Sequence, residues 1–250
     1  MFFNRDDSEK KGKEVLENLY FFSENQMLDC NQYIIKNKDT NELALFDGGN
    51  AISLQGLFKA MDKFNLNYKN ITKIFLTHEH VDHVLGVYKL MTVLRDNSPK
   101  IYAHEETAKI LGKGDESKIL PVAFGLKAEI FDVKIIPLNV NILNNDDEIK
   151  ISPEFNFHIH YTPGHSLGSI CYYEPNKKIL IPGDLVFIGG NFGRYDFPGG
   201  SLSTLQSSIK YIDRLDIKYL LPGHMGISEN GNKSVALSYR MIKSMGQNFF

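Results

Sequence analysis

Apolar residues along the chain follow two spacings that predict its secondary structure. Short apolar runs bounded by Gly, Pro, Asn or Asp are typical of strands, and they occur at 19–22, 32–35, 43–46, 71–76, 100–103, 155–161, 169–173, 178–181 and 219–221. Apolar residues at helical spacing predict helices within 51–65, 84–94, 105–111, 203–214 and 232–245. The segment 113–147 is harder to assign, although it contains a strand-like run at 129–136.

The order of these elements predicts an α/β fold. Strands and helices alternate, and several neighbouring strands are close enough for hairpins, so mixed sheets with helices on their outer faces are expected. No linker rich in Pro, Gly or Ser divides the chain, and residues 1–250 are therefore expected to form a single domain. The charged residues 1–13 are expected to form a flexible leader.

Composition narrows the partners that the protein could have. The 250 residues carry a net charge of −2, which gives no support for a nucleic-acid or membrane-surface partner. No apolar run approaches the roughly 18 residues of a membrane span, and the acidic, polar start does not resemble a secretory signal. The sequence thus predicts a cytoplasmic protein, and it leaves the oligomeric state open. Cys30 and Cys171 are too few for a Cys-rich metal site.

Four loops that follow predicted strands carry residues of the metal-ligand type. The first loop has the pattern H-x-H-x-D-H, and each of the other three places a His or an Asp directly after a Pro-Gly pair. Pro-Gly ends a strand and turns the chain, and loops at one edge of a scaffold are where sites commonly assemble. The candidate ligands are His78, His80, Asp82, His83, His165, Asp184 and His224.

These side chains predict a site for two divalent ions. Imidazole and carboxylate groups bind Zn²⁺, Fe or Mn without any thiolate, and the set exceeds what one tetrahedral ion can use. We therefore expect two ions per chain, with zinc favoured and iron or manganese as alternatives. His78 and His80 point the same way in an extended segment, and the following helix start directs Asp82 and His83 toward the second ion. The other histidines are His104, His158 and His160, and none of them is assigned to a metal.

The loop sequences resemble the metallo-β-lactamase-fold hydrolase superfamily over about residues 15–245. The match rests on 77–83 (THEHVDH), 162–165 (TPGH), Gly183-Asp184 and 222–224 (PGH), which occur in the family's order. The resemblance implies a four-layer αβ/βα sandwich of two mixed β-sheets, with helices on the outer faces and a dinuclear site at one sheet edge. It also implies the ligands of each ion, namely His78, His80 and His165 for the first and Asp82, His83 and His224 for the second, with Asp184 bridging. Asp47 occupies the family's first turn, where we expect it to orient a ligand histidine.

Particular positions narrow the branch within the superfamily. Asp184 stands where the antibiotic-degrading β-lactamases carry Cys, and Phe187 stands where the quorum-quenching lactonases carry Tyr. Residues 183–187 and 193–200 are similar to the glyoxalase II and persulfide dioxygenase branch. Arg194 lies about where glyoxalase II has a cationic residue that contacts its substrate, and Tyr195 is a further expected substrate contact. Gly226 replaces a Tyr of glyoxalase II and the family's C-terminal glutathione-binding domain is missing, which argues against glutathione as the thiol.

The resulting hypothesis is a dinuclear, metal-dependent hydrolase of a small thioester, ester or lactone. Asp184 would position a hydroxide that bridges the ions, and it would accept the proton; Asp82 is the second catalytic carboxylate. The positive charge of such a site, together with Arg194, favours an anionic substrate. One alternative is a mononuclear iron persulfide dioxygenase that uses two histidines and a carboxylate. Another alternative is a metal-binding module without catalysis.

Overall fold

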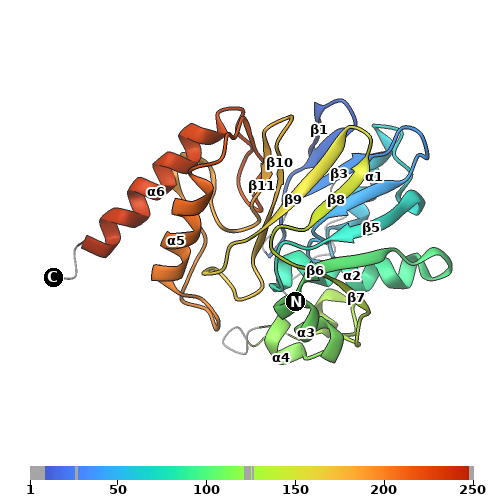
Figure 1. The fold of residues 1–250 in the computed structure, drawn as a ribbon. Helices are drawn as coiled ribbons and strands as arrows, with labels where there is room; N and C mark the ends of the chain where they lie inside the picture. The colour runs from blue at the N-terminus through green and yellow to red at the C-terminus, as the bar shows by residue number, and fades with distance from the viewer. Residues whose placement is uncertain (1–8, 26–27, 121–124, 126, 248–250) are drawn as a thin grey trace. The chain divides into compact units, whose positions relative to one another are not determined.

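The computed structural model describes residues 9–25, 28–120, 125 and 127–247. Contacts within the chain divide it into two compact units, residues 1–142 and residues 143–250. The strands form a seven-stranded sheet and a five-stranded sheet, and each sheet is accompanied by helices (Figure 1). Among the described residues, no helix is long and apolar enough to cross a membrane. The single domain expected from the sequence stays a prediction.

The first unit is built on the seven-stranded sheet, whose strands follow one another in chain order. The strands are β1 (Gly12–Leu16), β2 (Leu19–Phe22), β3 (Gln32–Lys36), β4 (Leu43–Phe46), β5 (Ile71–Phe75), β6 (Lys100–His104) and β7 (Val140–Leu143). The helices are α1 (Leu54–Asp62), α2 (Val81–Val93), α3 (Glu105–Lys113) and α4 (Glu116–Ile119), with 3₁₀ turns η1 (Tyr68–Asn70), η2 (Arg95–Asn97) and η4 (Ala128–Phe131). Strands β4, β5 and β6 run parallel, so their carboxyl ends share one edge.

Apolar residues at helical spacing hold α1 and α2 against this sheet. Met61 of α1 and Val84 of α2 belong to the same buried cluster as Leu45 of β4 and Ile74 of β5. Each fully buried side chain of this size stabilises the folded state by about 2 kcal/mol relative to an exposed one. The two crossover helices are therefore fixed to the strands whose ends carry the candidate ligands.

The second unit is built on the five-stranded sheet, in the order β12-β11-β10-β9-β8. Its strands are β8 (Glu148–Ser152), β9 (Phe155–Tyr161), β10 (Ile170–Glu174), β11 (Ile179–Ile181) and β12 (Tyr219–Leu220), and its helices are α5 (Leu202–Ile212) and α6 (Gly231–Gln247), with the 3₁₀ turn η5 (Ile188–Gly190). Strand β10 is antiparallel to β9 and β11, while β11 is parallel to β12. Strands β9, β11 and β12 therefore point the same way, and the three Pro-Gly loops that follow them lie at one edge.

Helices α5 and α6 cover one face of the second sheet (Figure 1). Leu205 of α5 and Val235 of α6 lie in one buried cluster with Cys171 of β10 and Leu180 of β11. Ser201 caps α5, because its hydroxyl accepts a hydrogen bond from the backbone N–H of Thr204 at 3.3 Å. Two mixed sheets with attached helices confirm the predicted fold class.

The structure corrects two predictions. The predicted strand at 129–136 is wrong, because η4 occupies Ala128–Phe131 and Asp132 turns the chain with a φ of 53°. The predicted leader is also too long, since β1 begins at Gly12 and Lys10 is buried. The ammonium group of Lys10 lies 2.7 Å from Oδ2 of Asp29 and holds this segment in the first unit. Residues 1–8 of the expected leader lie outside the described residues.

Candidate metal centre

The histidine loop 77–83 follows β5 and clusters its imidazoles within the first unit. The extended chain ends at His80, the N-cap residue of α2, with φ −69° and ψ 153°. The ring of His78 lies 4.7 Å from that of His80 and 4.1 Å from that of His83, measured between centroids. In addition, Nε2 of His83 lies 3.7 Å from Oδ2 of Asp82. Four of the predicted ligands are thus neighbours in one unit.

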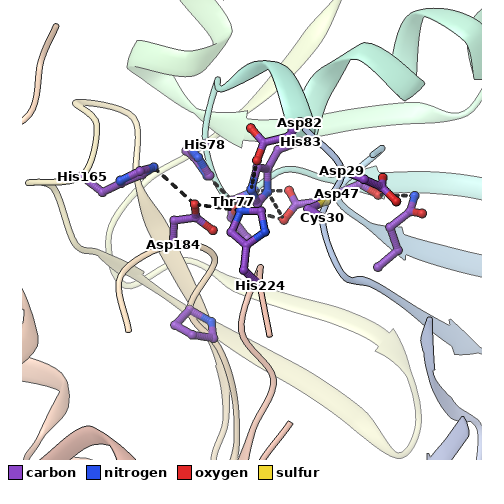
Figure 2. Close-up of polar contacts among 12 residues, drawn as sticks. Asp29, Cys30, Asp47, Thr77, His78, Asp82, His83, His165, Asp184 and His224 are labelled. Carbon is purple, nitrogen blue, oxygen red and sulfur yellow. Dashed lines mark hydrogen bonds and ion pairs between the residues drawn. The ribbon is translucent and has the colours of Figure 1, made fainter. Parts of the chain in front are cut away.

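Asp47, in the turn after β4, is the buried centre of this arrangement (Figure 2). Its Oδ1 accepts the backbone N–H of Thr77 at 2.8 Å, and its Oδ2 accepts the Thr77 hydroxyl at 2.9 Å. Oδ2 also lies 2.9 Å from Nδ1 of His83. The carboxylate therefore links the turn after β4 to both ends of the histidine loop.

These contacts determine which ring nitrogen of each histidine carries the proton. A carboxylate only accepts, so Nδ1–H of His83 donates to Asp47 and Nε2 keeps its lone pair. The Thr77 hydroxyl donates its hydrogen to Asp47, so its oxygen accepts a hydrogen bond from Nδ1–H of His78 at 3.0 Å. A single carboxylate thus leaves Nε2 of both His78 and His83 available to a metal.

Two glycines let α2 approach the Asp47 turn closely. The backbone N–H of Gly48 donates to the carbonyl of His83 at 2.6 Å, and that of Gly86 donates to the carbonyl of Gly49 at 2.8 Å. A Cβ atom at Gly86 would overlap the carbonyl oxygen of Gly48. The absence of a side chain at Gly86 is therefore what allows the helix to carry His83 up to Asp47.

A third group of ligand-type atoms lies deeper in the same unit. The thiol of Cys30, the carboxylate of Asp47 and the ring of His83 offer atoms within 4.8 Å of one another. Burial raises the pKa of the Cys30 thiol to about 11, although nearby His83 opposes the shift. The carboxylate of Asp47 already accepts hydrogen bonds from Thr77 and contacts Nδ1 of His83. Within this triad, Asp47 therefore acts on His83, which is itself a candidate ligand.

In the second unit, Asp184 faces two histidines from different loops. Its Oδ2 lies 3.2 Å from Nε2 of His224 and 3.6 Å from Nε2 of His165 (Figure 2). The three residues follow β11, β12 and β9, whose carboxyl ends share one edge. All three of the predicted ligands in this unit are therefore brought together.

Asp184 Oδ2 lies at a distance from each histidine nitrogen that fits two ligands of the same metal ion. Two donors that bind one tetrahedral Zn²⁺ at about 2.0–2.1 Å are themselves separated by roughly 3.3 Å. The distances from Asp184 Oδ2 to Nε2 of His165 and His224 lie close to this value. One oxygen at similar distances from two imidazole nitrogens also suits a bridging carboxylate. The donor set of imidazoles and carboxylates is that of zinc, iron or manganese.

The backbone of Arg194 orients His165. Nδ1 of His165 lies 2.7 Å from the carbonyl oxygen of Arg194. Since a carbonyl only accepts, Nδ1–H is the donor and Nε2 keeps its lone pair toward Asp184. A Cβ atom at Gly193 would overlap the carbonyl oxygen of Asp184 and crowd the ring of His165, so the chain passes this point only as glycine.

The side chains expected to contact substrate have other partners in the structure. The guanidinium of Arg194 makes a bidentate pair with Asp196, with N–O distances of 2.9 and 2.7 Å. Tyr195 packs against the buried cluster of the second unit. Phe187 contacts the ring of His224 edge-on at 5.7 Å between centroids. Substrate contacts by Arg194 and Tyr195 remain predictions.

The three remaining histidines have contacts apart from the candidate ligands. Nδ1 of His104 caps α3 by accepting the backbone N–H of Glu106. His158 lies 3.9 Å from the carboxylate of Glu148. His160 is buried beneath α5, where its Nδ1 lies 2.9 Å from the hydroxyl of Tyr211. None of these printed contacts is with a candidate ligand.

Two contributors to the site were missed in the sequence. Thr77 was read only as part of the motif, yet its hydroxyl links Asp47 to His78. The carbonyl of Arg194 orients His165, but every residue type has such a carbonyl, so the sequence does not reveal its role. The Gly193-Arg194 pair is the one available signal, because glycine beside a ligand loop indicates a close approach of the backbone.

Comparisons with known proteins agree with this geometry. Residues 26–224 match the metallo-beta-lactamase superfamily. The hydroxyacylglutathione hydrolase GloC of Haemophilus influenzae is 31% identical over 211 residues, which cover 82% of this chain and 91% of the relative. The acyl-coenzyme A thioesterase MBLAC2 of Homo sapiens is 28% identical over 160 residues, 59% of this chain and 54% of the relative.

A solved structure gives the same result. The protein TTHA1623 in a di-iron-bound form has a TM-score of 0.66 and 26% sequence identity, and the match covers 84% of this chain and 94% of that chain. The motif order, the two mixed sheets and the convergent histidines and aspartates are all consistent with these matches. The chain belongs to the metallo-beta-lactamase superfamily.

Proposed function

We propose that this protein is a dinuclear metal-dependent hydrolase whose substrate is a small thioester, with an ester or a lactone as the related possibilities. The observation that carries the proposal is the placement of Asp184 Oδ2 between Nε2 of His165 and Nε2 of His224. Asp47 adds support in the first unit, because it prepares Nε2 of His78 and His83 for a metal.

The division of ligands follows the family resemblance. His78, His80 and His165 would hold one ion, while Asp82, His83 and His224 would hold the other, and Asp184 would bridge them. Divalent ions in such sites lower the pKa of a bound water toward about 7 and polarise a carbonyl oxygen. Zinc is favoured by the sequence, but the di-iron form of one similar structure makes iron a real alternative.

Asp184 would act as the proton acceptor when water attacks the substrate carbonyl. A carboxylate within hydrogen-bond reach of the attacking water holds it in line and takes its proton. Phe187, whose ring contacts that of His224, has no hydroxyl group to share this role.

The names of two relatives favour a thioester. One is called a hydroxyacylglutathione hydrolase and the other an acyl-coenzyme A thioesterase. The expected preference for an anionic substrate depended partly on a free Arg194, whereas its guanidinium pairs with Asp196. We therefore base the proposed substrate class on the acyl–sulfur bond and leave its net charge to experiment.

Elemental analysis combined with an activity panel tests the proposal. The purified protein is analysed for zinc, iron and manganese, then assayed on thioesters, esters, lactones, phosphoesters and a β-lactam, before and after chelator treatment. We expect about two ions per chain and metal-dependent hydrolysis that is fastest on thioesters. One iron per chain with oxygen consumption on a persulfide would contradict the proposal. So would two ions without any turnover, which would identify a metal-binding module.

A further inference from the structure

The loop that orients His165 carries an ion pair between near neighbours. Nε and Nη2 of Arg194 lie 2.9 and 2.7 Å from the two carboxylate oxygens of Asp196. The same guanidinium stacks over the ring of Phe197, 4.2 Å from its centroid. Bidentate pairing and stacking together restrict a side chain that would otherwise be free in solvent.

This ion pair and stack, called the Arg194 clip below, lie in a turn between two closely packed glycines. A Cβ atom at Gly193 would overlap the carbonyl oxygen of Asp184, and one at Gly200 would lie too close to the carbonyl oxygen of Tyr195. A hydrogen bond from Gly200 N–H to the carbonyl of Phe197, at 2.8 Å, closes the turn. The carbonyl of Arg194 lies within this turn, 2.7 Å from Nδ1 of His165.

We infer that Arg194 is a positioning residue: its pairing with Asp196 and its stacking on Phe197 hold the peptide group that orients His165. The inference rests on the proposed function, in which His165 is a metal ligand. Arg194 thus acts through its own carbonyl and does not present a cation to the substrate. The ion pair lowers the pKa of the Asp196 carboxyl and raises the pKa of the Arg194 guanidinium.

The two roles of Arg194 predict different responses to its partner. If Arg194 bound an anionic substrate, removal of Asp196 would free the guanidinium and improve binding. If Arg194 holds the loop, removal of either partner releases the same peptide group, and removal of both does no further harm. Lysine also separates the roles, because it keeps the charge but cannot form the bidentate fork.

The test uses five variants of the full chain: Arg194→Ala, Arg194→Lys, Asp196→Ala, the double alanine variant, and the charge exchange Arg194→Asp with Asp196→Arg. Arg214→Ala, at an exposed arginine after α5, is the control. Thermal unfolding first establishes that each variant is folded. Zn²⁺ affinity is then measured by competition with a chromophoric chelator, and kcat and KM are measured on neutral and anionic thioesters.

We expect Arg194→Ala, Arg194→Lys and Asp196→Ala each to weaken Zn²⁺ binding by about 10-fold, the low end for loss of a group that orients a ligand. The double variant should match the single ones, the exchange variant should recover most of the affinity, and Arg214→Ala should behave as the parent. The loss in kcat/KM should be the same for neutral and anionic substrates. The opposite pattern would overturn the inference: unchanged Zn²⁺ affinity, a higher KM for anionic substrates alone in Arg194→Ala, and rescue by lysine.

A second measurement decides the question without metal or turnover. In metal-free protein with ¹⁵N-labelled histidine, Nδ1–H of His165 should exchange slowly with water, and faster in Arg194→Ala and in Asp196→Ala. Equal exchange rates in all variants would show that the Arg194 clip does not hold the peptide group. If the parent protein bound no Zn²⁺ and hydrolysed nothing, the proposed function would fail, while this result would still decide the role of Arg194.

Discussion

The carboxylate oxygen Oδ2 of Asp47 lies 2.9 Å from Nδ1 of His83, 36 residues further along the chain. The same carboxylate accepts two hydrogen bonds from Thr77, one from the backbone and one from the hydroxyl. These three groups are all donors, and both carboxylate oxygens are engaged. Asp47 therefore fixes the tautomer of two candidate ligands and cannot be replaced by a side chain that also donates.

Asp47→Asn is expected to weaken metal binding by about 10- to 100-fold, as for other groups that orient a ligand histidine. The amide offers one acceptor where three donors require two, so one buried donor loses its partner at a cost of about 1–3 kcal/mol. Metal affinity by chelator competition and the free energy of unfolding without metal measure the two effects separately. Asp39→Asn, in the exposed turn between β3 and β4, is the control and should change neither. Unchanged metal affinity in Asp47→Asn would show that Asp47 does not control the tautomers.

Gly86→Ala is expected to destabilise the first unit strongly. Its Cβ would overlap the carbonyl oxygen of Gly48, and relief of such overpacking costs about 3 kcal/mol. Gly112→Ala is the matched control, since its Cβ would meet only the carbonyl oxygen of Leu138 at 3.8 Å. Alanine is favoured over glycine in a helix by roughly 0.5–1 kcal/mol, so Gly112→Ala should stabilise. Chemical unfolding measures both, and equal stability of the two variants would disprove the close-approach argument.

The sequence predicted the fold class and the ligand types because both leave periodic or chemical marks on residue identity. The strands that carry the candidate ligands end where Pro-Gly turns or the histidine motif predicted, as at Asp184 and His165. The predicted strand at 129–136 failed because alternating apolar residues alone do not show that a strand has a partner. Here Ile130 and Ile136 are exposed and only Phe131 is buried.

The groups that orient the ligands were less predictable. The family turn led us to expect that Asp47 orients a ligand histidine. The link from Asp47 through the Thr77 hydroxyl to His78, however, depends on hydrogen-bond geometry that a sequence does not contain. The carbonyl of Arg194 is a group that all residues possess, so the residue type at position 194 could not have indicated it, and only Gly193 beside it pointed to a close approach of the backbone. Arg194 itself was interpreted as a substrate contact because its charge was visible, whereas its pairing with Asp196 at i, i+2 was not anticipated.

Acidification is expected to lower the stability of the metal-free protein through His160. Burial lowers the pKa of His160 below its usual 6.5, an effect that nearby Asp146 opposes. The unfolded chain therefore takes up the proton first as the pH falls, and stability decreases below about pH 6.5 until the lowered folded pKa is passed. His160→Gln should make this decrease smaller. It should not remove the decrease, because burial also lowers the pKa of His104.

The free energy of unfolding at about pH 7 and pH 5, with chelator present, measures the contribution of His160. His158→Gln, a half-exposed neighbour on the same face of β9, controls for the loss of a histidine as such. A decrease of the same size in the parent and in His160→Gln would exclude His160 as a source of the pH dependence.

Asp82→Ala is expected to reduce the metal content from about two ions per chain to one. In the proposed ligand set Asp82 serves only the second ion, so the first should remain bound. The Asp82 carboxylate lies in the first turn of α2 and is not part of the buried apolar cluster, and the fold should therefore survive. Elemental analysis of dialysed protein gives the stoichiometry, and thermal unfolding reports the fold. One ion per chain in both proteins would contradict the dinuclear arrangement.

The variant Asp184→Asn tests whether Asp184 is a residue of the proposed metal site or only part of a turn. The carboxylate faces Nε2 of His165 and of His224, and an amide of the same shape carries no charge to share between two cations or to accept a proton. Turnover should fall by roughly 10²-fold or more, the range for a lost general base, and metal retention should weaken. Asp213→Asn, at the exposed C-terminal end of α5, should leave both unchanged. If Asp184 only shapes the Pro182-Gly183 turn, asparagine would serve as well, and near-parental turnover together with near-parental metal content would remove Asp184 from the site.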